Sequence, residues 1–99
     1  MKLSFRIRRI YFDAIKAGVK DCEVRRKNPF WDVRVAHAWE EFLMNQTVEA
    51  VLVCGKEVLR KECYKITEHP DPVSALGGEP SEQGWKDIGD GPVYKFHLR

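Results

Sequence analysis

The stretch Gly18-Val19-Lys20-Asp21-Cys22-Glu23-Val24-Arg25 decides how the first third of the chain folds. Gly18 follows a short helical pattern and is suited to end it, because glycine adopts the left-handed backbone conformation without strain. The residues after it begin a strand, in which successive side chains point to opposite faces. Asp21, Glu23 and Arg25 would then share one face, with Lys20 at the strand's entrance. We expect this charged cluster to form a pocket for a polar, planar ligand such as a nucleobase.

The length and composition predict a single domain spanning residues 1–99, because a chain of 99 residues suffices for one hydrophobic core. A hydrophobic fraction of 43% beside a charged fraction of 32% is typical of a globular protein. No apolar run approaches the roughly 18 residues of a membrane-spanning helix. Residues 1–6 turn charged at once and lack the apolar region of a signal peptide. These features predict a cytoplasmic protein that does not contact the membrane, and they do not indicate an oligomeric state.

The cysteines and histidines indicate neither a disulfide framework nor a metal site, and we expect no cofactor. The number of cysteines is odd, and no His or Cys lies at the short sequence spacing from another that metal ligands require. The cysteines and histidines of the chain are Cys22, Cys54, Cys63, His37, His69 and His97. Cys22 has two interpretations, a small buried residue or a nucleophile beside Lys20.

Positive charge is concentrated near the N-terminus. Residues 1–27 hold nine Lys or Arg and three acids, whereas the remaining residues hold eight bases and twelve acids. If the first third of the chain lies on one side of the fold, that side attracts phosphate. A solvated charged face is the alternative interpretation.

Periodicity and turn residues predict an α+β fold of five strands with two helices. Asp32 is the expected N-cap of the second helix, and the segment between the fourth and fifth strands is expected to be mostly loop, with one helical turn near residues 73–76. Five mostly antiparallel strands that wrap into a small barrel would leave no exposed edges. The expected strands are 3–7, 21–26, 48–53, 58–67 and 93–98, and the expected helices are 9–17 and 33–44.

The order strand, helix, Gly-x-Lys-x-x-Glu-x-Arg and hairpin resembles the ASCH domain, a branch of the PUA-like superfamily. Gly18, Lys20, Glu23 and Arg25 fall on the positions of that motif, and Tyr11–Ala17 is similar to the helix that precedes it in the family. The resemblance implies a PUA-like β-barrel with flanking helices and a cleft for RNA or a modified nucleoside.

The resemblance also implies an alternative function, a small hydrolase acting on N4-acetylcytidine or on RNA. Lys20 falls where the acetylcytidine amidohydrolases carry a catalytic Lys, but Glu23 stands where they carry a Thr. In such an enzyme Lys20 would stabilise the oxyanion and Glu23 would act as general base. Glu79 and Glu82 are candidates for a further Glu that those enzymes use.

We expect the aromatic and cationic residues around the motif to complete a binding site. Arg25 offers a planar fork to a phosphate or a base edge, and aromatic rings can stack on a base. For Phe30, folding back onto the core is the alternative, and Trp39 is expected in the core. The residues expected to bind RNA or a nucleoside are Lys20, Glu23, Arg25, Arg26, Tyr11, Phe30, Trp31 and Arg9.

Two other functional classes stay open from the sequence. Lys20, Glu23 and Arg25 could form a purely structural salt-bridge network. The acidic remainder of the chain could instead contact a partner protein, which the salt dependence of binding would distinguish from nucleic acid.

Overall fold

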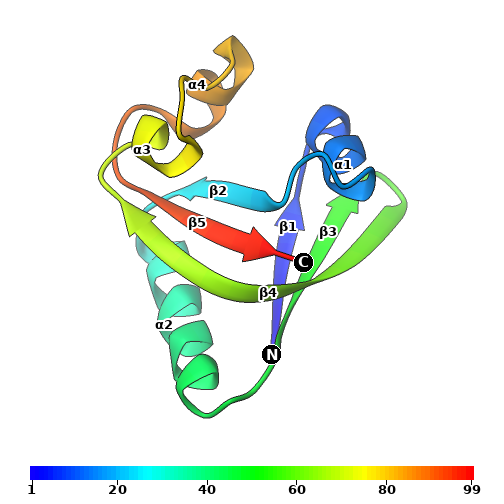
Figure 1. Cartoon of the computed structure of the whole chain (residues 1–99), viewed down its shortest axis with the longest axis vertical. Helices are drawn as coiled ribbons and strands as arrows, with labels where there is room; N and C mark the ends of the chain where they lie inside the picture. The colour runs from blue at the N-terminus through cyan, green and yellow to red at the C-terminus, as the bar shows by residue number, and fades with distance from the viewer.

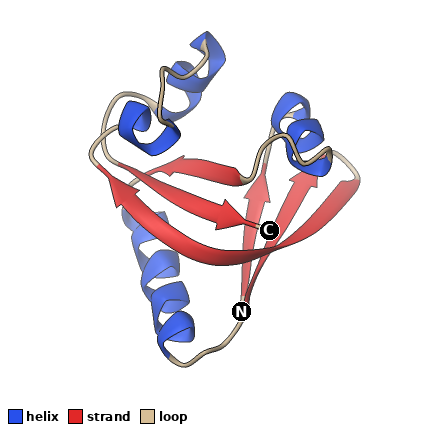
Figure 2. Ribbon diagram, in the orientation of Figure 1, coloured by secondary structure: helices blue, strands red, loops and turns tan.

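A computed structural model describes all 99 residues as one curled sheet with helices at its ends and across one face (Figures 1 and 2). No helix has the length and apolarity to span a membrane. The strands are β1 (Lys2–Arg6), β2 (Cys22–Arg26), β3 (Val48–Cys54), β4 (Glu57–His69) and β5 (Val93–Leu98). The helices are α1 (Arg9–Lys16), α2 (Pro29–Leu43), α3 (Pro72–Leu76) and α4 (Glu82–Ile88).

The five strands form one mixed sheet in the order β1-β3-β4-β5-β2. Three neighbouring pairs are antiparallel, as the sequence predicts, but β1 runs parallel to β3. The sheet curls into a half-barrel (Figure 2). It does not close, because β1 and β2 lie at its two edges and do not pair with each other. The predicted α+β class and barrel-like curvature are thus found, whereas full closure is not.

The hydrophobic core lies on the inner face of the half-barrel. Alternating residues of β1 and β3, such as Phe5 and Leu52, pack there against Phe12 of α1 and Val35 of α2. Phe96 of β5 is fully buried at the centre. A smaller cluster lies on the outer face of β2 and β5, where α3 covers Cys22, Val24 and Val93.

The first helix ends as predicted. Gly18 has a φ of +77°, and its N–H donates to the carbonyl of Ile15. This left-handed residue turns the chain directly into β2, which places Glu23 and Arg25 on the inner face of the half-barrel.

Helix α2 begins earlier than predicted, at Pro29, and its N-cap is Asn28 and not Asp32. The Asn28 side chain accepts a hydrogen bond from the N–H of Trp31, and proline at the first helical position loses no intrahelical bond. Asp32 instead accepts hydrogen bonds from Lys27 and from the hydroxyl of Tyr94.

The earlier start of α2 changes which side chains are buried. Phe30 and Trp31 belong to a helix and not to a loop. Leu43, the last residue of α2, is 85% exposed. Trp39, predicted in the core, is 41% exposed at the edge of it, and its indole N–H donates to the carbonyl of Ile66.

The predicted loop after β4 contains two helices, so the structure has four helices and not two. Helix α3 matches the expected helical turn, but α4 was not expected. Ser81 caps α4 by accepting from the N–H of Gly84, and Gly89 ends it with a φ of +70°. The many glycines and prolines here separate two short helices, so they do not mark a single continuous loop.

We predict that Asn28→Ala lowers the free energy of unfolding by about 1 kcal/mol, because the N–H of Trp31 loses its acceptor. Asn28→Ser keeps a capping oxygen and should cost only a few tenths of a kcal/mol. Urea unfolding monitored by circular dichroism measures both changes. Equal stability of Asn28→Ala and the wild type would contradict the assigned cap.

Candidate functional site

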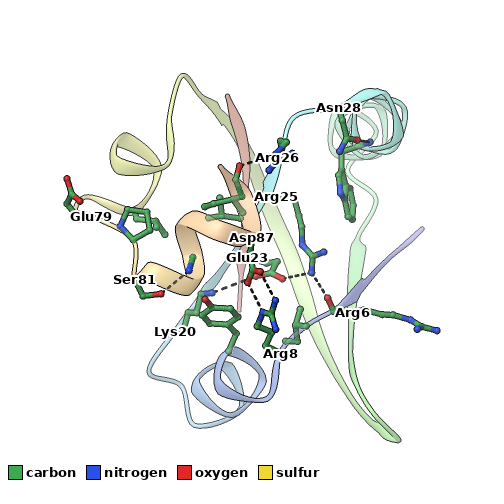
Figure 3. Close-up of a pocket in the computed structure, with 18 residues that line it drawn as sticks. Arg6, Arg8, Lys20, Glu23, Arg25, Arg26, Asn28, Glu79, Ser81 and Asp87 are labelled. Carbon is green, nitrogen blue, oxygen red and sulfur yellow. Dashed lines mark hydrogen bonds and ion pairs between the residues drawn. The ribbon is translucent and has the colours of Figure 1, made fainter. Parts of the chain in front are cut away.

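A cavity of about 780 Å³ lies where the half-barrel is open, between the edges β1 and β2 and beneath α4 (Figure 3). It is lined by both polar and apolar groups. Its lining residues are Arg6, Ile7, Arg8, Tyr11, Lys20, Glu23, Val24, Arg25, Arg26, Asn28, Trp31, Leu76, Glu79, Pro80, Ser81, Gly84, Asp87 and Ile88.

The cavity is bordered by main-chain groups of β2 that have no partner in the sheet. Two backbone hydrogen bonds show which residues of β2 bond to β5. The N–H of Leu98 donates to the carbonyl of Asp21, and the N–H of Lys27 donates to the carbonyl of Pro92. In an antiparallel ladder the bonded residues alternate, so Glu23 and Arg25 bond to β5. The N–H and C=O of Val24 therefore point toward the open edge.

The edge of β1 is open in the same way. The N–H of Ile7 donates to Val53 O, and the carbonyl of Met1 accepts from the N–H of Glu49. The residues of β1 that bond to β3 are therefore odd-numbered, and the peptide groups of Ser4 and Arg6 face away from the sheet. Two strand edges without a partner strand thus converge on one cavity, where β2 offers the N–H and C=O of Val24 and the Arg6 carbonyl of β1 accepts from Arg25.

The Glu23 carboxylate lies inside this opening and is only 5% exposed (Figure 3). One of its oxygens lies 2.7 Å from Arg25 Nη2, and the other lies 3.6 Å from Lys20 Nζ. A buried carboxylate costs several kcal/mol of desolvation unless cations compensate it. The motif therefore supplies the charge and its compensation within six residues.

Arg25 also connects the two edges of the half-barrel. Its Nη2 donates to the carbonyl of Arg6 in β1 at 2.8 Å, in addition to its bond to Glu23. Its guanidinium lies 5.4 Å from the ring centroid of Phe5 and 5.9 Å from that of Trp31. One side chain thus spans the gap that no β-ladder closes.

Aromatic groups line two sides of the cavity. On one side the ammonium of Lys20 lies 4.4 Å from the ring centroid of Tyr11. On the other, Trp31 is 6% exposed and stacks on Phe5 with centroids 5.0 Å apart. Tyr11 is more accessible than Trp31, so it is the better surface for an incoming ring.

Helix α4 is held over the cavity by a bidentate ion pair. Arg8, directly before α1, donates from Nε and Nη2 to the two carboxylate oxygens of Asp87, at 2.8 and 2.7 Å. These hydrogen bonds hold the pKa of Asp87 below its ordinary value and raise the pKa of Arg8. Because the two residues come from opposite ends of the chain, this pair fixes the distance between α1 and α4.

Arg26 supports the other end of α4. Its Nε donates to the carbonyl of Ile88 at 3.2 Å, close to Gly89. A Cβ on Gly89 would come within 3.1 Å of Arg26 Nη2. Glycine at this position therefore allows both the positive φ and the close approach of the Arg26 guanidinium.

Six of the eight residues predicted to bind a ligand line the cavity: Lys20, Glu23, Arg25, Arg26, Tyr11 and Trp31. The other two do not. Phe30 is 55% exposed on α2, with the Arg34 guanidinium 3.4 Å from its ring centroid, and Arg9 pairs with Asp13 and Glu57. The helical geometry explains Phe30, because adjacent residues of a helix point about 100° apart and Trp31 takes the inward position.

Several lining residues lie outside the predicted motif. Arg8 and Asp87 pair across 79 positions of sequence, which no local pattern announces. Ser81 followed by Glu82 is the N-cap signal that could have located α4. Of the two Glu residues expected near the site, Glu79 lines the cavity, whereas Glu82 points to solvent beside Lys86.

Cys22 lies on the outer face of β2 and is covered by α3, as expected of a small buried residue. Burial raises the pKa of its thiol, although the nearby cations Lys20 and Lys95 oppose the effect. Such a thiol is a poor nucleophile. No group of three or more His, Cys, Asp or Glu residues is arranged to hold a metal ion.

Comparison of the chain with models of protein families, with curated proteins and with solved structures finds no match. The ASCH resemblance of the motif therefore stays a prediction from the sequence.

We predict that Asp87→Asn loosens α4 while the half-barrel stays folded, because Arg8 loses its ion pair across the cavity. Amide hydrogen exchange of Trp85 and Gly89, whose N–H groups bond within α4, should accelerate. Exchange in β3, such as at Leu52, should not change. Glu82→Gln, which removes the solvent-exposed pair with Lys86, is the matched control.

Acidification should act on the wild type as Asp87→Asn does. The pKa of the Asp87 carboxyl is lower in the folded protein than its ordinary value of about 3.9. Its ion pair therefore stabilises the fold fully at pH values above the ordinary pKa, and this stabilisation is lost as the pH falls through the lowered pKa. We therefore expect α4 exchange, corrected for its intrinsic pH dependence, to rise only below about pH 4. If exchange in α4 accelerated in only one of the two cases, Asp87→Asn or acid, the result would contradict the role of the ion pair.

Proposed function

We propose that the cavity binds a nucleobase, presented by a free nucleoside or by RNA. One observation carries this proposal: two unpaired strand edges, a buried carboxylate between two cations and an aromatic ring face the same cavity. A planar heterocycle with donors and acceptors along its edge complements each of these groups. The volume of about 780 Å³ lies within the range of small-molecule sites.

Recognition of the base rests on the open edge of β2 and on Glu23. The N–H and C=O of Val24 can pair with an acceptor and a donor on the edge of a base. Glu23 can accept from an exocyclic amino group, while Lys20 can donate to a carbonyl oxygen of the base. Tyr11 can stack on the ring, and such stacking is worth about 1–3 kcal/mol per base.

The rim of the cavity supplies positive charge for phosphate. Arg26 lines the cavity and has no acidic partner within 4 Å, whereas the side chain of Arg6 points away from the cavity (Figure 3). A guanidinium group can donate two parallel hydrogen bonds to two oxygens of one phosphate. This arrangement supports a ligand that carries phosphate, and it agrees with the excess of basic residues in the first part of the sequence.

The proposal includes membership of the PUA-like class, on the ASCH motif and the curled α+β half-barrel that places the motif at its opening. It also includes a cytoplasmic location, which the three free cysteines support because reduced thiols are typical of that compartment.

Hydrolysis of N4-acetylcytidine or of RNA is the second candidate function. Lys20 reaches the cavity, whereas Glu79 lines it with its carboxylate pointing away (Figure 3). However, both oxygens of Glu23 already face cations, which favours a carboxylate that organises the site over one that takes a proton from water. The geometry therefore favours binding.

We predict that Lys20→Ala weakens nucleoside binding at least tenfold and shifts the thermal midpoint by only a few degrees, because Arg25 still compensates Glu23. Lys16→Ala, which removes an exposed lysine of α1, should not change binding. The measurement is an NMR titration with the four common nucleosides and N4-acetylcytidine, with products followed by chromatography.

Shifts centred on the cavity without turnover are the expected result. Release of cytidine from N4-acetylcytidine that Lys20→Ala abolishes would instead make the chain a hydrolase. No shift with any nucleoside would leave Lys20, Glu23 and Arg25 as a structural network and would contradict the proposal.

A further inference from the structure

The outer face of β4 and β5 carries a group of cations that do not take part in the cavity. Register pairs Lys65 with His97 and Thr67 with Lys95, which places these residues on the face opposite the core. His69 follows on the same face, and its Nε2 lies 2.8 Å from the Thr67 hydroxyl, which also lies 3.0 Å from His97 Nε2. The face therefore combines two lysines, two imidazoles and a hydroxyl.

These lysines and histidines have no acidic partner. Neither lysine nor either histidine lies within 4 Å of a carboxylate. Several other charges of β3 and β4 are paired, as in Arg60 with Glu49 and Glu62 with Arg99. Burial and the neighbouring Lys95 and Lys65 lower the pKa of His97, and the charge of Asp21 opposes them. The face is thus a positive surface with unused hydrogen-bond donors.

Exposed aromatic rings lie among these cations. A bulge between Cys63 and Lys65 inserts Tyr64, so that Tyr64 and Lys65 both lie opposite His97. The Tyr64 ring is 41% exposed, its centroid lies 6.1 Å from that of the His97 ring, and the Arg99 guanidinium lies 4.6 Å from it. Aromatic rings among cations on an open sheet face suit stacked bases and phosphates, whereas an acidic peptide has no use for the rings.

Only β2 separates this surface from the cavity, and the outward residues of β2 there, Cys22 and Val24, are buried in the cluster that includes Ala75 of α3. Register places Cys22 beside His97 and Val24 beside Lys95, while the opposite edge of Val24 borders the cavity. Neighbouring strands lie about 5 Å apart, so the lysines of β5 and β4 stand about one and two strand spacings from that edge. In Figure 1, β4 and β5 pass in front of α2 and no helix crosses their middle.

We propose that this outer face binds the backbone of a single-stranded RNA whose base lies in the cavity, an inference that rests on the proposed function. Lys65 and Lys95 contact phosphates, and Tyr64 and His97 stack on bases adjacent to the bound one. The ligand is therefore an RNA strand of several nucleotides, of which the free nucleoside is only a part.

The test is the salt dependence of binding to a fluorescein-labelled single-stranded RNA of twelve nucleotides, measured by anisotropy. The Lys65→Ala/Lys95→Ala variant should bind more weakly at low salt. The slope of log K against log salt should fall by about 1.4, since each phosphate contact on a single strand contributes about 0.7. Nucleoside binding should stay unchanged, and the thermal midpoint should too, because neither lysine makes an ion pair.

Lys16→Ala/Lys56→Ala removes the same charge from exposed lysines at α1 and at the β3–β4 turn and serves as the matched control. An equal slope for the two double variants would overturn the inference, as would a wild type that binds nucleosides but not the RNA. Equal, lysine-dependent binding of labelled polyglutamate would show an acidic protein partner and overturn it too. Failure of the nucleoside titration alone would instead contradict the cavity proposal.

Discussion

The buried Glu23 carboxylate and the two cations that compensate it are the interaction on which the rest of the structure depends. A carboxylate on the inner face of β2 needs compensating cations, and Lys20 and Arg25 supply them, Arg25 at the shorter distance. Arg25 meets this demand and also donates to Arg6 in β1. The network therefore holds two strand edges near each other without pairing them, which keeps the half-barrel open and its main-chain groups available to a ligand.

The local chemistry of the motif was sufficient to predict this arrangement in outline. Gly18 ends α1 because of its positive φ, and strand alternation then places Glu23 and Arg25 on one face. The alternation of side chains along β2 does not predict which edge of the sheet β2 occupies. Strand order depends on pairings between distant segments, above all the parallel contact of β1 with β3, and the cavity follows from that order.

The missed features have two physical causes, competition between nearby groups of similar chemistry and dependence on long-range contacts. Asn28 and Asp32 can both cap a helix, and Asn28 takes that role because Lys27 and Tyr94 already bind the Asp32 carboxylate. The shift brings Trp31 to the cavity and leaves Phe30 outside. Helix α4 is short and has no fully buried residue, so its position depends on the long-range bonds of Arg8 and Arg26 and not on an apolar pattern.

The most direct test of the account is amide hydrogen exchange at the edge of β2 with and without a saturating nucleoside. Although Val24 lies in the middle of a strand, its N–H has no partner in the sheet, so it should exchange faster than the N–H groups of Glu23 and Arg25. A bound nucleobase that uses this edge should slow Val24 selectively. Equal protection of all three amides in the free protein, or no change at Val24 when the nucleoside is bound, would contradict an open, ligand-reading strand edge.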